Sequence, residues 1–170
     1  MAVFWTDLDD YMVGLFRTAM GTGSAYTTLK AQTINKRIWA DMFEWPLWTL
    51  PAVAVSCYQV SYDANEHSGT NSKRYTRTYK CAASGLVSGV VNYEAAMVVD
   101  TVTDAVKEFY ERMEAVLRTN TFTVQSAGII AGNAKITQGY IDVIRYPNDD
   151  NASLKRLGVA HFLFDVIAKG

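Results

Sequence analysis

Hydrophobic residues near the start of the chain recur every three or four positions, which is typical of an amphipathic helix. The apolar residues of this stretch are Leu8, Tyr11, Met12, Leu15, Phe16 and Ala19. This spacing lines one helical face. Thr6 or Asp7 can cap the first turn, and Gly21 can take the left-handed conformation that ends a helix. The pattern predicts a helix over residues 6–20.

Two stretches in the first half of the chain alternate between apolar and polar residues, as strands do. Residues 52–62 are apolar on both faces at first and then alternate. Residues 73–83 alternate except at Arg77, which breaks the apolar face, and the polar residues 63–72 lie between the two stretches. The three segments together predict a long β-hairpin with 63–72 as its loop. Cys57 and Cys81 are then candidate cross-strand neighbours, and we expect them to be two buried thiols.

The spacing of hydrophobic residues changes along the second half of the chain, from a helical to a strand pattern. A broad apolar stripe over residues 92–118 predicts the longest helix. Strand patterns follow over Thr121–Ile130, Lys135–Tyr146 and Leu157–Ile167. Gly132-Asn133 is expected to be a hairpin turn between the first two. In the last strand we expect Ala160, Phe162, Phe164 and Val166 to face one way and His161, Leu163 and Asp165 the other.

This order of elements predicts an α+β fold. We expect a mainly antiparallel sheet with a long β-hairpin arm, packed by an N-terminal helix and a long central helix. The length is that of a single domain, residues 1–170. Within it, residues 21–51 read as an irregular linker rich in aromatic residues, with a short helix around residues 34–43.

Composition excludes several function classes. The chain has 16 Lys and Arg against 17 Asp and Glu, a net charge of −1, which lacks the basic excess of a dedicated nucleic-acid binder. No apolar run reaches the roughly 18 residues of a membrane span. Asp7, Asp9 and Asp10 stand where a signal peptide would carry basic residues. Two cysteines do not make a disulfide framework, which suits a reducing cytoplasm.

The residues with catalytic potential form no convincing active site. The histidines are His67, in the polar loop, and His161, in the last predicted strand. We interpret them as a solvated loop residue and a sheet-surface residue. No Cys or His spacing matches a zinc site. Ser88 is not central between Gly85 and Gly89, so the nucleophile-elbow motif is absent. We expect no enzyme, no cofactor and no metal.

The first candidate binding surface lies on the predicted hairpin. Arg74, Arg77 and Lys80 alternate there with Tyr75 and Tyr79. Interleaved basic and aromatic side chains suit a nucleic acid. They also suit protein docking, because Tyr and Arg are common interface anchors. A solvated hairpin face is the third interpretation.

The second candidate surface is the aromatic segment 39–48. It contains Phe43, Trp45 and Trp48. Core packing accounts for part of this cluster, but Trp45-Pro46-Leu47-Trp48 is difficult to bury completely in a small fold. Exposed aromatic residues in number mark protein interfaces. We expect these three residues to contribute to packing or to a subunit interface.

The order of segments also carries a resemblance. A helix precedes a linker that ends in Leu50-Pro51-Ala52-Val53-Ala54-Val55, which opens the first strand. The hairpin to about Ala83 follows, then the long helix from about Tyr93 to Arg118, and the final strands close with residues 158–166. In this pattern, over nearly its whole length, the chain resembles the tail terminator (tail-completion) proteins of long-tailed bacteriophages.

The resemblance implies a structural, non-enzymatic protein. Members of that family form a ring, typically a hexamer, which caps the finished tail tube, stops its polymerisation and offers a surface to the head connector. The implied partners are further copies of the chain, the tail tube protein and a head–tail connector or stopper protein, with no membrane and no small-molecule substrate. The implied location is the tail or neck of a virion assembled in the host cytoplasm.

Two alternatives stay open. The tryptophan-rich segment 39–48 departs from the family, so another phage neck or tail-tube-related structural protein is the first alternative. A nucleic-acid-binding module that uses the basic hairpin residues 73–80 is the second. A ring of identical copies needs two different patches on each subunit. The aromatic segment and the hairpin arm are the candidate patches.

Overall fold

Strands make up most of the chain that the structure describes. The computed structural model describes residues 4–36, 49–65, 74–92, 99–124, 129–145 and 154–169. These residues form two helices and a mixed sheet of eight strands. The predicted α+β class is therefore confirmed.

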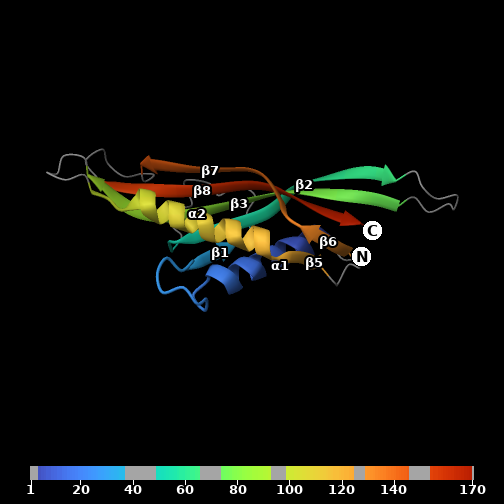
Figure 1. The fold of residues 1–170 in the computed structure, drawn as a ribbon, viewed down its shortest axis with the longest axis horizontal. Helices are drawn as coiled ribbons and strands as arrows, with labels where there is room; N and C mark the ends of the chain where they lie inside the picture. Colours follow the sequence, from blue (N-terminus) through green and yellow to red (C-terminus); the bar gives the residue numbers. More distant parts are fainter. Residues whose placement is uncertain are drawn as a thin grey trace.

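The elements follow one another in an order close to the expected one (Figure 1). Along the chain they are α1 (Phe4–Met20), β1 (Thr33–Asn35), β2 (Ala52–Asn65), β3 (Arg74–Asn92), β4 (Val99–Asp100), α2 (Val102–Thr119), β5 (Thr121–Val124), β6 (Ile129–Asn133), β7 (Lys135–Arg145) and β8 (Lys155–Lys169). The predicted N-terminal helix is confirmed as α1.

The order of strands across the sheet differs from their order in the chain. From one side the order is β1-β2-β3-β8-β6-β5, while β7 also pairs with β8 and β4 with β3. β1 and β2 are parallel, and the other pairs are antiparallel. The last strand of the chain thus lies inside the sheet, with β3 on one side and β6 and β7 on the other.

The β2–β3 pair confirms the predicted hairpin, although not as a free arm. The ladder runs from Ala52 opposite Leu86 to Asn65 opposite Arg74. β8 accompanies β3 as far as Thr76. Almost all of the described hairpin therefore lies within the sheet, and the residues beyond it fall outside the described part.

Both helices cover the same face of the sheet and enclose the main core (Figure 1). The core side chains include Leu8, Met12 and Phe16 from α1, Val106, Phe109 and Met113 from α2, and Ala160, Phe162, Phe164 and Val166 from β8. The expected alternation of β8 is confirmed. Burying each large apolar side chain contributes about 1.5–3 kcal/mol, so this face holds most of the stabilising contacts.

Two glycines allow α2 to lie close to the sheet. A Cβ added to Gly85 in β3 would meet side-chain atoms of Phe109 and Met113. A Cβ added to Gly158 in β8 would meet Val106. Because these positions have no side chain, the helix packs directly on the strand backbones.

The long helix begins later than its apolar stripe predicts. It starts at Val102, whereas Asn92 ends β3 and Val99–Asp100 form β4. The Asp100 Oδ1 accepts the N–H groups of Val102 (3.1 Å) and Thr103 (2.9 Å). These bonds satisfy helix donors that have no partner within the helix. A side-chain hydrogen bond from Thr103 is the main reason that the pKa of Asp100 is lowered.

The described part of the linker does not begin a helix at Ile34. β-branched Thr33 and Ile34 belong to β1, which pairs with Ala52 and Val53 of β2. The expected helix around residues 34–43 is therefore wrong at its start, and residues 37–43 lie outside the described residues. Residues 33–35 form a short parallel strand and not a helix, because they pair with the backbone of β2.

Arg112 of α2 holds the first part of the linker. Its guanidinium donates a hydrogen bond of 2.6 Å to the Thr28 carbonyl and lies 3.8 Å from the ring centre of Tyr26. It also pairs with Glu108 one turn earlier. The Arg112 residue is only 8% exposed, so these contacts compensate for the burial of its charge.

Gly132-Asn133 is not a hairpin turn. β6 and β7 do not pair with each other; they follow end to end along β8, with Ala131 opposite Ala168 and Lys135 opposite Asp165. β8 is 15 residues long, long enough to pair with both. The hairpin forms instead between β5 and β6, so the predicted strand 121–130 is two strands.

Candidate functional site

The outer side of β7 is an open edge of the sheet among the described strands. β7 pairs with β8 from Lys135 to Arg145 and forms the edge of the sheet in Figure 1. Tyr140 is 45% exposed and Ile141 is 37% exposed. Long exposed edge strands are templates for pairing with another chain. The edge therefore has the geometry for strand addition.

The hydrogen bonds of β7 show which backbone groups point outward. The Val143 N–H donates to the Asp142 Oδ1 at 2.8 Å, so it is directed away from β8. Backbone groups of alternate residues in an antiparallel strand point to opposite sides. Ile141 and Gly139 therefore present their N–H and C=O groups to the same open side as Val143. Asp142 occupies one donor of this edge.

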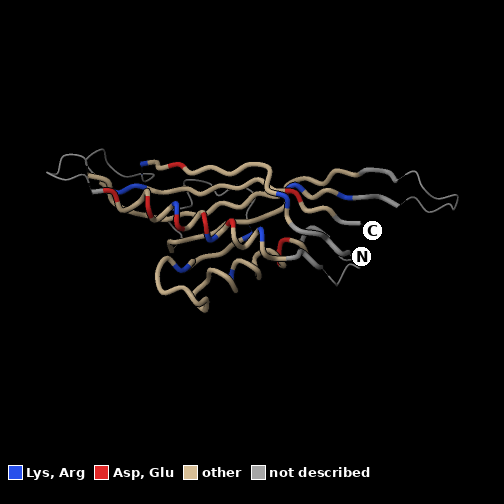
Figure 2. The backbone as a smooth tube through the Cα atoms, in the orientation of Figure 1, with Lys and Arg blue, Asp and Glu red and all other residues tan. Residues whose placement is uncertain are grey.

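Charge is sparse along the same strand. Its charged residues are Lys135, Asp142 and Arg145, so residues 136–141 form an uncharged stretch (Figure 2). Charged side chains are a common means of protecting an edge from pairing. The middle of β7 has none.

Tyr140 borders a buried polar pair of the neighbouring strands. Its ring centre lies 5.1 Å from that of His161, and the His161 Nδ1 shares a hydrogen bond of 2.7 Å with the Ser84 Oγ. His161 lies in β8 as expected, but it is only 5% exposed, so the expected position on the sheet surface is wrong. Burial lowers the pKa of His161, so its imidazole is neutral near neutral pH.

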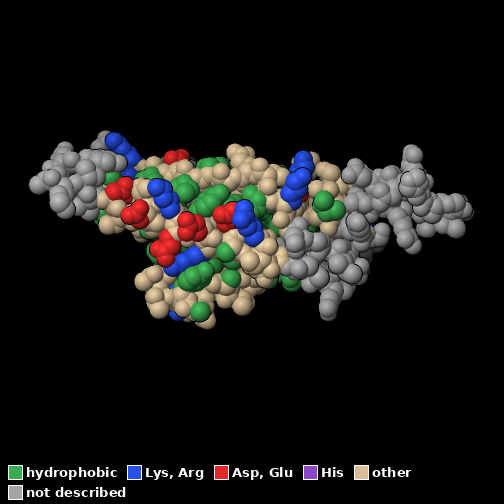
Figure 3. Space-filling view, in the orientation of Figure 1, with side chains coloured by type: hydrophobic (Ala, Val, Ile, Leu, Met, Phe, Trp, Pro, Cys, Tyr) green, Lys and Arg blue, Asp and Glu red, His purple; other side chains and the backbone are tan. Residues whose placement is uncertain are grey.

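Two of the basic hairpin residues lie on opposite faces of the sheet. Alternation in β3 places Lys80 on one face and Arg77 on the other. Lys80 lies directly opposite Asp165 in β8. Figure 3 shows acidic and basic side chains alternating along α2 on the helix-covered face. The described residues of this face thus offer a nucleic acid no extended positive patch.

Tyr79 belongs to the core. It is 2% exposed, and burial raises its pKa to about 12, an effect that Arg77 partly opposes. The ring that we expected at an interface thus packs with the apolar residues under the helices. The Tyr75 backbone lies in β3, whereas Phe43, Trp45, Trp48 and His67 lie outside the described residues.

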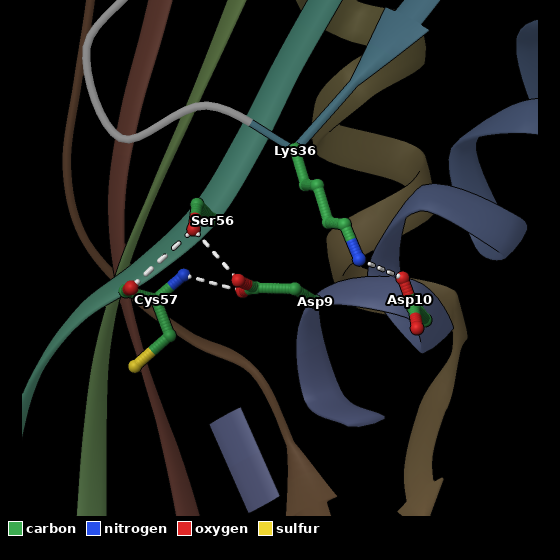
Figure 4. Close-up of polar contacts among 5 residues, drawn as sticks. All are labelled: Asp9, Asp10, Lys36, Ser56 and Cys57. Carbon is green, nitrogen blue, oxygen red and sulfur yellow. Dashed lines mark hydrogen bonds and ion pairs between the residues drawn. The ribbon is translucent and has the colours of Figure 1, made fainter. Parts of the chain in front are cut away.

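A carboxylate joins α1 to β2 (Figure 4). The Asp9 Oδ1 accepts the Cys57 N–H at 2.8 Å, and its Oδ2 accepts the Ser56 hydroxyl at 2.9 Å. Next to it, Lys36 pairs with Asp10 at 2.6 Å. Burial raises the pKa of Asp9, and the bonds from Cys57 and Ser56 oppose that rise.

The Asp9 contact positions the helix over an irregular point in the sheet. The register between β2 and β3 shifts between Cys57 and Gln59, which leaves Tyr58 without an opposite residue. Such a bulge frees a backbone N–H from the ladder. Asp9 accepts that N–H, so we interpret this cluster as a structural link between α1 and β2.

Sequence reasoning found the strand that becomes β7 but not its importance. A strand pattern does not reveal whether the strand will lie at an edge. The sequence identifies Asp9 only as one of three acidic residues near the start of the chain, because the pattern of one helix cannot show which strand it faces. The available signal in the sequence was the adjacent pair Tyr140 and Ile141 within the predicted strand. In a strand, neighbouring residues point to opposite faces, so this pair places an apolar side chain on each face.

Other classes of site are not seen in the described residues. No group of three or more His, Cys, Asp or Glu side chains there could hold a metal ion. No helix among them is long and apolar enough to cross a membrane.

Comparison with known proteins adds no family. No protein-family model matches the chain, and no curated protein matches it significantly.

Proposed function

We propose that this chain is a structural protein of a long-tailed bacteriophage that forms a ring, of six copies by analogy, on the end of the tail tube. The ring would stop tube polymerisation and provide the surface on which the head connector or stopper protein docks. The order of elements that resembles the tail terminator proteins supports this proposal. The observation that carries its mechanism is the exposed edge strand β7.

The sheet has two unlike edges, as ring closure requires. β7 lies at one side and β1 at the other, and the sequence of parallel and antiparallel pairs makes them run in opposite directions. Copies related by rotation about a ring axis would therefore bring β7 of one subunit antiparallel to β1 of the next. Such contacts are heterologous, the type that builds rings.

On the β1 side, a groove is the candidate position for the incoming strand. A groove of about 290 Å³ lies between the end of α1 and β1, lined by residues that include Arg17, Thr22 and Gln32. Strand addition would use backbone hydrogen bonds for affinity and side chains such as Ile141 for specificity. We therefore propose this groove as the acceptor for β7 of the neighbouring copy.

The hairpin arm keeps a role in the proposal. Its outer part, with Arg74, Tyr75, Arg77 and Lys80, would contact a neighbouring copy or the tube. Phe43, Trp45 and Trp48 would add apolar contact area there or within the subunit. Alanine at Arg74 and Arg77 tests the arm: unchanged assembly and tube capping would remove it from the interface.

The test is the assembly state of the purified full-length chain, measured by light scattering and negative-stain imaging, alone and with tail tubes. We expect a ring the size of six 18.9 kDa chains, and we expect Ile141→Lys to lower assembly at least tenfold because it places a charge on the pairing edge. Ile167→Lys is the matched control, since Ile167 has a similar exposure, 42%, in β8.

Two results would contradict the proposal. A monomer that neither forms rings nor binds tube ends would exclude end-capping. Rings that form equally well from Ile141→Lys and from the native chain would exclude β7 as the interface while leaving the ring itself intact. In the second case, a melting temperature equal to that of the native chain shows that the Ile141→Lys variant is folded.

A further inference from the structure

The two cysteines of the chain lie opposite each other in the β2–β3 ladder. Cys57 and Cys81 are register partners and the only cysteines present. Both are free thiols, they are 1% and 0% exposed, and both belong to the core beneath the helices. Their side chains thus leave the sheet on the same face.

The ladder places the two cysteines within reach of a disulfide. The Cys57 N–H donates to Asp9 (Figure 4) and is not used in the ladder. Opposed residues of an antiparallel pair have Cα atoms about 4.5–5.5 Å apart, whichever type of pair they form. A disulfide accepts Cα separations of about 4.4–6.8 Å. The backbone needs little movement to allow the bond.

Each thiol donates to a backbone carbonyl of its own strand, Cys57 Sγ to Gln59 at 3.5 Å and Cys81 Sγ to Tyr79 at 3.7 Å. The neighbouring Cys81 thiol lowers the pKa of Cys57, whereas Cys57 and burial raise the pKa of Cys81. Because the thiolate is the reactive form, Cys57 is the sulfur that reacts first.

We propose that Cys57 and Cys81 are an oxidation site, at which hydrogen peroxide forms a disulfide inside the folded chain. The Cys57 thiolate attacks one peroxide oxygen, the O–O bond breaks, and a sulfenic acid forms while the departing hydroxide takes a proton to become water. The Cys81 sulfur then attacks the Cys57 sulfur, and the S–O bond breaks. The Cys81 proton leaves with the second water, so two thiols are oxidised and one peroxide is reduced.

The bond would stabilise the hairpin against unfolding. It closes the chain between residues 57 and 81, and the chain-entropy relation for a loop of this size predicts a shift of up to a few hundred-fold in the folding equilibrium. One consequence rests on the proposed function. A subunit assembled in a reducing cytoplasm as thiols would gain this bond after release of the virion, where disulfides persist.

The experiment exposes the folded native chain to hydrogen peroxide, blocks remaining thiols with iodoacetamide under denaturing conditions, and measures the intact mass. We expect a monomer that has lost two hydrogens and takes up no label. We also expect its denaturation midpoint in urea to rise and to return to the starting value after reduction. Burial of both sulfurs makes the reaction slow, so a time course over hours is followed.

Cys57→Ala and Cys81→Ala are the matched controls, because each keeps one buried thiol. Neither should show the reversible rise in midpoint. The measurement on the native chain needs no variant, so the test holds even if a variant fails to fold. It also needs no ring, so its outcome is separate from that of the assembly experiment.

Three results would overturn the proposal. In the first, both thiols of the peroxide-treated chain remain fully alkylated. In the second, oxygen atoms add to the mass while the thiols still take up label, so no disulfide has formed. In the third, the disulfide forms but the midpoint falls, which would mean that the native geometry opposes the bond.

Discussion

β8 and β7 lie side by side from Lys135 opposite Asp165 to Arg145 opposite Arg156, yet their surroundings differ sharply. From residue 157 to residue 162 every residue of β8 is buried, whereas every residue of β7 from 137 to 142 is exposed. The same backbone ladder thus joins an interior strand to an edge strand.

The difference teaches that pairing alone does not decide the role of a strand. β8 has strand neighbours on both sides and α2 over one face, so its side chains stabilise the fold. Among the described strands, β7 pairs with β8 alone, so its outer backbone groups are open to another strand. Changes in β8 should therefore alter folding, and changes in β7 should alter association.

The largest expected effect is on the core side of this comparison. Phe162→Ala should lower the free energy of unfolding by about 3–5 kcal/mol, because it leaves a cavity beneath α2 next to Tyr110, whose ring centre is 4.4 Å away. Urea denaturation measures this change in the free energy of unfolding. Ile141→Ala in β7 is the control and should change the value by less than about 0.5 kcal/mol. Similar losses in both variants would remove the distinction between the strands.

A second prediction uses the buried histidine of β8. The folded pKa of His161 is below that of the unfolded chain, so between these two values the unfolded state binds more protons. The free energy of unfolding should therefore fall as pH falls from about 6.5 towards the folded pKa, by at most about 1.4 kcal/mol per pH unit. Above the unfolded pKa this contribution is fully present.

Denaturation of the native chain and of His161→Gln over a pH series measures this contribution. The difference between the two chains should depend on pH below about 6.5 and be constant above it. A difference that is constant over the whole pH series would show that burial does not shift the pKa of the His161 imidazole.

The smallest effect on folding is expected at Asp142 in β7. Asp142→Ala removes the carboxylate that accepts the Val143 N–H and should change the free energy of unfolding by less than about 0.5 kcal/mol, because the group is exposed. It should nevertheless strengthen self-association, because it opens a donor on the edge. Sedimentation velocity over a concentration series is the measurement. Weaker association than that of the native chain would contradict the role of this edge, and Asp142→Asn is the conservative control.

Periodicity predicted the local elements well where the chain carried its own signals. The N-terminal helix, the hairpin with Cys57 opposite Cys81, and the two-faced final strand followed from spacing that one segment contains. The start of the long helix did not, because apolar residues before Asp100 continue the stripe while Asp100 itself provides the cap.

Site prediction was weaker than fold prediction. Alternation placed Tyr79 and Arg77 on one face of β3, but it could not tell that this face is covered by helices and that Tyr79 is buried there. It also could not tell that Lys80 would lie opposite Asp165, because this pairing joins residues that are far apart in the sequence.

The sequence by itself determined the period of each segment, the faces of the strands and the near-zero charge, because these depend on neighbouring residues. Only the tertiary structure decided that β8 enters the middle of the sheet, that β7 remains at its edge, and that Asp9 reaches the bulge at Cys57. These are contacts between distant parts of the chain. Their cost in chain entropy is offset only when the whole core forms, so no local pattern encodes them.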